Sequence, residues 1–120
     1  MKTLFLLIIL TQNGAGDISA SFVNTETLEQ CQNKTLMLEA VFTASNIPIV
    51  ENHCIKSDLR FSKFRHASSS NATRYFYLVK VGNEMVEVEQ MPDWRECMTR
   101  AKMNTGLDKV YCSSSVQSLQ

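Results

Sequence analysis

The 120-residue sequence lacks a net charge, because 12 lysine and arginine residues balance 12 aspartate and glutamate residues. The charges are also dispersed along the chain, and no block of one sign occurs. A surface that binds nucleic acid or an anionic membrane needs a concentrated basic patch. The sequence therefore argues against nucleic acid and membrane surfaces as partners.

The chain also lacks an apolar run long enough to span a bilayer, since its longest one, residues 4–10, is far shorter than a transmembrane helix requires. Lys2 precedes this run, and small and polar residues follow it as far as Ala20. This order predicts a signal peptide over residues 1–20, cut after Ala20 or, as a second choice, near residues 14–16. Residues 21–120 are then expected to form one secreted domain.

Metal-binding and catalytic patterns are scarce. No C-x-x-C pair occurs, and His53 and His66 stand at no recognisable ligand spacing, so neither a metal nor a cofactor is expected. A histidine that acts as a general base needs a nucleophile or an orienting carboxylate beside it. Asp58 and Glu96 are the candidate partners, and nothing in the sequence brings them close. We expect no catalytic residues and no enzymatic activity.

Four cysteines are present, and they are Cys31, Cys54, Cys97 and Cys112. In a small exported domain an even number of cysteines predicts disulfides, here two of them. Three pairings are open at this point. Pairing Cys97 with Cys112 would close the shortest loop between neighbours and contribute about 3 kcal/mol through chain entropy.

Residues 74–89 predict a β-hairpin around which the domain is organised. Runs rich in valine, tyrosine and phenylalanine flank Gly82-Asn83, a pair suited to a type II′ turn. The first strand is apolar on both faces, which predicts protein on both of its sides. In the second strand Val86 and Val88 alternate with glutamates, which predicts one buried face and one exposed face.

The segment before this hairpin divides into a helix, two strands and a loop. A short helix capped at Asn24 or Thr25 is expected first. Apolar residues alternate with polar ones over residues 35–43 and again over residues 54–64, and both segments are predicted to be strands. Residues 66–73 are polar and without periodicity, so we expect an exposed loop.

A second helix is predicted over residues 93–103, with Asp93 as its N-cap. A short extended segment follows at residues 110–112, and residues 113–120 are interpreted as a frayed polar tail. We see no internal repeat. The expected fold is mainly β, with α+β as an alternative: a small antiparallel sheet or an incomplete lipocalin-like barrel with one or two short helices and two disulfides.

Two kinds of site remain. Asn33-Lys-Thr35 and Asn71-Ala-Thr73 match the N-glycosylation sequon, so Asn33 and Asn71 are predicted to carry glycans. The aromatic residues either pack in the core or line a pocket for an apolar or amine-bearing ligand. The candidate pocket residues are Phe42, Phe61, Tyr75, Tyr77 and Trp94, with Glu39 as a candidate polar group.

The order of these features resembles the tick salivary lipocalins. The resemblance lies in Leu36-Met-Leu-Glu-Ala-Val-Phe42, then His53-Cys-Ile-Lys-Ser57, then Asp93-Trp-Arg-Glu-Cys-Met98 and finally Val110-Tyr-Cys112. It covers about two-thirds of the chain after residue 20. Carried over from that family, Cys97 pairs with Cys112. The family partner of Cys54 lies near the C-terminus, and here only Cys31 is left for it.

The resemblance implies a salivary glycoprotein that sequesters a small host mediator, such as a biogenic amine or a lipid, or that engages a host defence protein. Taken with the predicted export, the first hypothesis is a secreted, extracellular, monomeric binding protein for such a ligand. The alternative is a small protein-interaction module, an inhibitor or toxin-like ligand that acts through its surface. An enclosed apolar cavity would favour the first, and an exposed apolar patch would favour the second.

Overall fold

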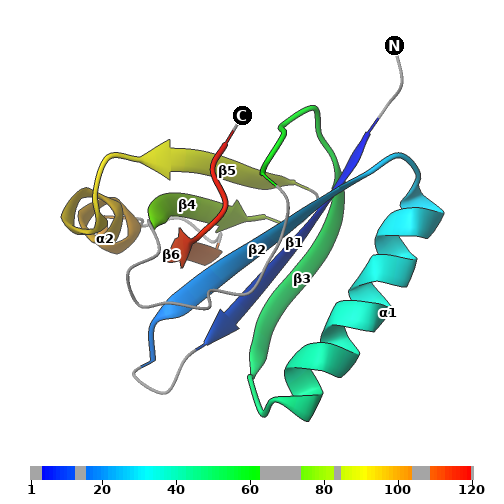
Figure 1. The fold of residues 1–120 in the computed structure, drawn as a ribbon. Coiled ribbons are helices and arrows are strands. Elements are labelled where there is room, and N and C mark those ends of the chain that lie inside the picture. The colour runs from blue at the N-terminus through cyan, green and yellow to red at the C-terminus, as the bar shows by residue number, and fades with distance from the viewer. Residues whose placement is uncertain (1–3, 13–15, 63–73, 83–84, 104–108, 120) are drawn as a thin grey trace.

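The computed structural model describes residues 4–12, 16–62, 74–82, 85–103 and 109–119. Six strands form one curled sheet in the order β3-β1-β2-β6-β4-β5 (Figure 1). The strands are β1 (Phe5–Gln12), β2 (Ile18–Thr25), β3 (Ile49–Lys56), β4 (Tyr75–Val81), β5 (Val86–Met91) and β6 (Lys109–Ser115), and the helices are α1 (Leu28–Ala44) and α2 (Trp94–Lys102). The predicted class, mainly β with two helices and two disulfides, is confirmed.

The chain builds the same arrangement twice. In each half two strands form a hairpin, a helix follows, and a last strand returns to pair antiparallel with the first strand of the hairpin. The first unit is β1-β2-α1-β3 and the second is β4-β5-α2-β6. No repeat was expected from the sequence, and the two helices differ in length, 17 residues against 9.

The two units also carry their caps and disulfides at equivalent places. Thr27 caps α1 and Asp93 caps α2, each accepting a hydrogen bond from the backbone N–H three residues later. The helix cysteine lies four residues after the cap in both units. The Cys31–Cys54 disulfide joins α1 to β3, and the Cys97–Cys112 disulfide joins α2 to β6. The two predicted disulfides are confirmed, and among the three pairings left open the structure has the one that the family resemblance implied.

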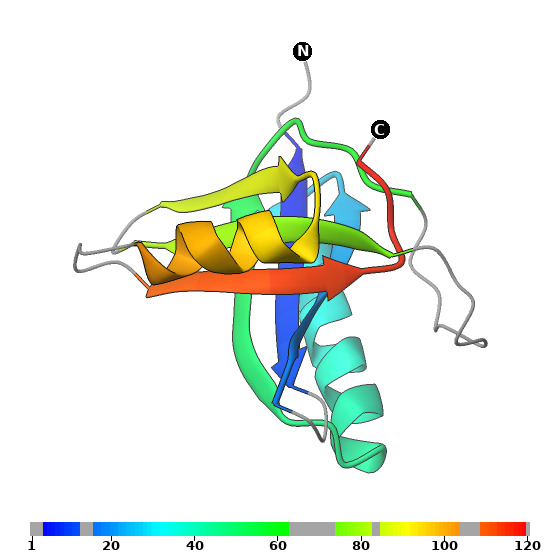
Figure 2. The same cartoon turned by 90° about the vertical axis from the view of Figure 1, so that its left-hand side faces the viewer.

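The two units meet at a narrow seam. β2 and β6 pair in parallel at only two positions, Ile18 with Ser113 and Ser19 with Ser114, and every other named strand pair is antiparallel. Beyond this seam the second unit crosses over the first, with each helix on the outer side of its own strands (Figure 2). The interior between the units is filled by apolar side chains of both.

β1 supplies the centre of this core. The side chains from Leu6 to Leu10 are all 0% exposed. Leu6, Ile8 and Leu10 face the second unit, while Leu7 and Ile9 face α1. The predicted signal peptide covers this strand, so cleavage after Ala20, which stays a prediction, is incompatible with this fold.

The prediction of a strand over residues 35–43 is wrong, because these residues continue α1. Alternation and helical spacing coincide in this stretch. Cys31, Leu38 and Phe42 recur at intervals of seven and four, and this face packs against β1 and its neighbours. The helix ends at Ser45, after which Asn46 takes a positive φ of 57°.

The strand predicted over residues 54–64 is also largely wrong, since β3 ends at Lys56. Phe61 forms only an isolated bridge, and its partner Leu119 belongs to the segment interpreted as a frayed tail. That interpretation is wrong too: β6 extends to Ser115, and Gln117 is 1% exposed. The predicted loop over residues 66–73 lies outside the described residues.

The central hairpin and the second helix are confirmed. β4 and β5 pair antiparallel, and Val79 and Leu78 are buried on opposite faces of β4. The Gly82 N–H donates to the Met85 carbonyl at 2.8 Å. The pairing of β4 with β5 therefore includes Gly82, which was predicted to be the first residue of the turn. Asn83 lies outside the described residues.

Candidate functional site on the outer face

A cleft of about 450 Å³ opens on the outer face of the sheet, where the two units meet. Its lining, among the residues that the structure describes, consists of Asp17, Ser19, Arg74, Phe76, Trp94 and Ser114. They come from the start of β2, the start of β4, the end of β6 and the first turn of α2. The cleft, which we call the outer cleft, is large enough for one small molecule.

The fold explains how these side chains come together. Ser19 and Ser114 are paired across the two-residue seam, and Ser114 is also opposite Phe76 on β4. Trp94 follows the cap of α2, and its ring lies 5.7 Å from the ring of Phe76 at an interplanar angle of 57°. The floor therefore combines two aromatic rings with two hydroxyl groups.

Charges of both signs stand at the rim of the outer cleft. Asp17 and Arg74 are exposed, and each lies just before the strand that follows it in the chain. An aromatic surface beside a carboxylate suits a ligand that joins a ring to an ammonium group, because the ring buries apolar area and the ammonium meets an opposite charge. The guanidinium group of Arg74 suits a carboxylate.

The five residues of the predicted pocket do not converge. Phe61 and Tyr77 are core neighbours with Tyr75 packed against them, whereas Phe42 is on the buried side of α1 and Trp94 is the first residue of α2. Of the five, only Trp94 lines the outer cleft. Glu39 is on α1, where its carboxylate accepts a hydrogen bond from Asn52.

The interior between the units is occupied where those aromatic residues meet. The rings of Phe22 and Phe61 stack at 3.9 Å, and the ring of Tyr77 meets both edge-on at 5.3 and 5.5 Å. Burial raises the pKa of Tyr77 to about 12, so its hydroxyl stays protonated and donates to the Gln117 carbonyl at 2.7 Å. Side chains thus take the space that an apolar ligand would need there.

A polar cluster that sequence reasoning missed joins β3 to β6. The Glu51 carboxylate lies 2.9 Å from His53 Nε2, 3.2 Å from the Tyr111 hydroxyl and 3.5 Å from Lys109 Nζ. Burial alone would raise the pKa of Glu51, but the hydrogen bonds from His53 and Tyr111 and the charge of Lys109 outweigh it and lower that pKa. Burial and the nearby Glu51 charge raise the pKa of Tyr111.

This cluster brings His53 a carboxylate partner two residues away, not Asp58 or Glu96. Alternation along β3 places Glu51 and His53 on one face, which was the signal available in the sequence. The Glu51 side chain is only 14% exposed and already has three partners. We therefore interpret the cluster as a link between β3 and β6. His66 lies outside the described residues.

The remaining predicted sites are on α1 and beyond it. Asn33 is exposed on α1 and lines a groove of about 520 Å³, whereas Asn71 lies outside the described residues. In the part of the chain that the structure describes, no group of three or more histidine, cysteine or acidic residues could hold a metal ion. Within the same ranges no helix is both long and apolar enough to cross a membrane.

Comparison of the chain with protein-family models, with curated proteins and with solved structures finds no match.

Proposed function

We propose that this protein is secreted with the segment up to Ala20 retained, since that segment supplies β1 and the start of β2, and that it binds a small aromatic amine in the outer cleft. The observation that carries the proposal is the cleft itself. Phe76 and Trp94 offer a ring-binding surface, and Asp17 stands at the rim as the partner of an ammonium group. Arg74 would hold the carboxylate of ligands that carry one, as an aromatic amino acid does.

Two further features support the proposal, one against a lipid as the ligand and one for an extracellular location. The stacked rings of Phe22, Phe61 and Tyr77 fill the interior in which a lipid chain would have to lie. Two disulfides are compatible with an extracellular protein, because such bonds persist in oxidising compartments. On this proposal the protein performs no reaction and lowers the free concentration of its ligand.

Trp94 makes the proposal directly measurable, because it is the only tryptophan in the sequence. Its fluorescence should change saturably when phenethylamine or phenylalanine binds, since both ligands place a ring against it. Hexylamine, which has no ring, and laurate, a lipid, should leave the emission unchanged. The absence of a saturable change with any of the aromatic probes would refute the proposal.

Variants that remove a charge test whether the residues at the rim of the outer cleft bind the ligand. Asp17→Ala should weaken phenethylamine binding by about 2- to 5-fold, the range expected when an exposed ion pair worth about 0.5–1 kcal/mol is lost. Arg74→Gln should weaken the binding of phenylalanine and leave that of phenethylamine unchanged. The matched control is Asp58→Ala, which removes an exposed carboxylate outside the cleft.

A specific observation also favours the alternative, a protein-interaction module. Leu36, Met37 and Val41 of α1 are 66%, 58% and 40% exposed, and together they form an apolar strip on the outer side of the helix. A dye that fluoresces on apolar surfaces should bind this strip. The double variant Leu36→Glu/Met37→Glu should lose the dye signal without losing secondary structure, and an unchanged signal would exclude the strip as an adhesive surface.

A further inference from the structure

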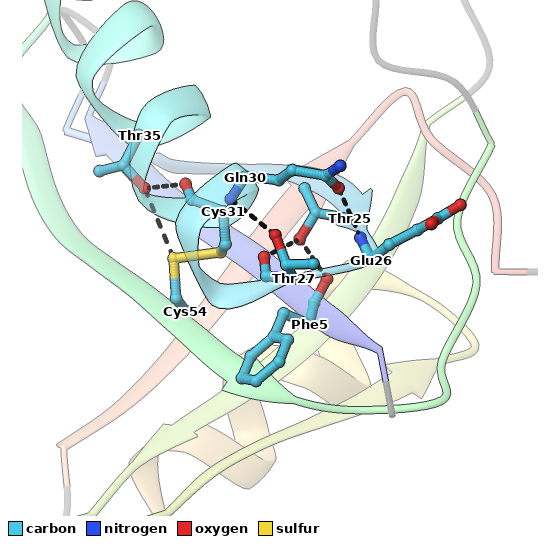
Figure 3. The surroundings of a disulfide bond; sticks show 8 residues. All are labelled: Phe5, Thr25, Glu26, Thr27, Gln30, Cys31, Thr35 and Cys54. Atoms are coloured by element: carbon cyan, nitrogen blue, oxygen red, sulfur yellow. Dashed lines mark hydrogen bonds between the residues drawn. A yellow bond between two sulfur atoms is a disulfide. The ribbon is translucent and has the colours of Figure 1, made fainter. Parts of the chain in front are cut away.

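The sequon at Asn33 lies next to a disulfide in the folded protein. Asn33 is on α1 between Cys31, which is bonded to Cys54, and Thr35, which completes the sequon. Figure 3 shows Thr35 directed towards both cysteines. The Thr35 hydroxyl donates to the Cys31 carbonyl at 2.8 Å and lies 3.6 Å from the sulfur of Cys54.

This geometry separates the two side chains that the glycosylating enzyme must engage together. Residues two apart on an α-helix point about 200° away from each other. Asn33 is accordingly exposed, whereas Thr35 is half-buried against the disulfide with its hydroxyl already engaged. An enzyme that binds the asparagine amide and the threonine hydroxyl at once therefore cannot use this sequon in the folded chain.

We infer that Asn33 is N-glycosylated only before α1 forms and the Cys31–Cys54 disulfide closes, so that disulfide closure ends access to the site. In the transfer, the amide nitrogen of Asn33 forms a bond to C1 of the sugar and loses a proton. The bond from C1 to the pyrophosphate of a lipid-linked oligosaccharide donor breaks, and the lipid pyrophosphate leaves. The inference rests on the predicted export and is independent of ligand binding in the outer cleft.

The folded protein has room for the product. Asn33 lines the groove of about 520 Å³ together with Gln30, Lys34 and Met37 of α1 and residues 24–26 at the end of β2. This mixed polar and apolar lining suits the hydroxyl groups and the apolar face of a sugar ring. A glycan attached early is therefore compatible with the finished fold, although it can no longer be added at that stage.

The test measures the fraction of Asn33 that carries a glycan in the full chain expressed in eukaryotic cells, by peptide mass mapping before and after enzymatic removal of glycans. Partial occupancy is expected in the wild type. Occupancy should rise in the double variant Cys31→Ala/Cys54→Ala, and also in cells that express the wild-type chain and are given a membrane-permeable reductant during synthesis. Thr35→Val removes the sequon and gives the reference value of zero occupancy at Asn33.

The second disulfide provides the matched control. Cys97→Ala/Cys112→Ala also removes a disulfide but leaves the surroundings of Asn33 unchanged, so it should not raise Asn33 occupancy. A glycan at Asn71 in the same molecules shows that the chain was exposed to the glycosylating enzyme. Equal occupancy in the wild type and in Cys31→Ala/Cys54→Ala, whether complete or absent, would overturn the inference, as would an equal rise in both double variants.

Discussion

Gln117 offers the sharpest test of how the two units are held together. Its side-chain amide acts as a substitute peptide group for β2, whose pairing with β6 stops after two residues. The backbone N–H of Phe22 donates to Gln117 Oε1 at 2.7 Å, and Gln117 Nε2 donates to the Phe22 carbonyl at 2.6 Å and to the Ser62 carbonyl at 2.7 Å. Buried backbone groups need such partners when no strand supplies them.

Gln117→Leu keeps a side chain of similar size and removes all three hydrogen bonds. At about 1 kcal/mol each, and with the buried Phe22 N–H left unpaired at a cost of about 1–3 kcal/mol, the free energy of unfolding should fall by roughly 4–6 kcal/mol. For a domain of this size that corresponds to a decrease in Tm of roughly 15–25 °C. Urea unfolding followed by Trp94 fluorescence and by circular dichroism measures the change.

The same substitution at an exposed glutamine is the control. Gln90 is exposed on β5, and Gln90→Leu should change the free energy of unfolding by less than about 0.5 kcal/mol. If Gln117→Leu destabilised the protein by less than about 1 kcal/mol, the hydrogen bonds of Gln117 would not hold the two units together.

Three further predictions concern the rest of the fold. A chain that starts at residue 21 should fail to form this structure by circular dichroism, because it loses five fully buried side chains worth about 1.5–3 kcal/mol each; a natively folded truncation would contradict this. The pKa of Glu51 is lowered in the folded state, so the ionised Glu51 contributes fully to stability above the ordinary carboxyl pKa, and this contribution is lost as the pH falls through the lowered pKa. Glu51→Gln should therefore reduce the decrease of Tm at acidic pH, measured as Tm against pH. Replacing both cysteines of either disulfide by alanine should cost about 3 kcal/mol in urea unfolding, and slightly more for the disulfide between α1 and β3, whose cysteines are 23 residues apart against 15.

What could be predicted from the sequence depended on local signals. The β4–β5 hairpin follows from alternation around a glycine, and α2 follows from the Asp93 cap and a helical spacing of apolar residues. These signals lie within a few residues of one another and survive in the fold. The Cys97–Cys112 disulfide is also a short-range feature, whereas Cys31 was assigned to Cys54 only by elimination within the family resemblance.

The sequence was ambiguous where two structures share one pattern. An apolar run such as residues 4–10 fits a signal peptide and a strand buried on both faces equally well, and β1 is such a strand. Alternation over residues 35–43 fitted a strand, yet the same residues place Leu38 and Phe42 on one side of α1. Only tertiary packing distinguishes these readings.

The outer cleft was predictable only in part. Trp94 was a candidate, but Asp17 and Phe76 join it because β2, β4 and α2 meet at the seam, and no spacing in the sequence encodes that meeting. The polar C-terminal segment was misread for the same reason. Gln117 is buried through hydrogen bonds to residues 55 and 95 positions away in the chain, which no local pattern reports.

The twofold use of one arrangement has a consequence for how the chain can be divided. Each unit is contiguous in the sequence, residues 5–56 and 75–115, and neither disulfide crosses from one unit to the other. A chain cut between Ser62 and Arg74 would thus give two fragments that each oxidise on their own. Their reassociation would depend on the shared core and on Gln117 and Leu119, which reach back from the second fragment to the first. The linker between residues 62 and 74 would then be needed only to keep together two halves that share one order of strands and helix.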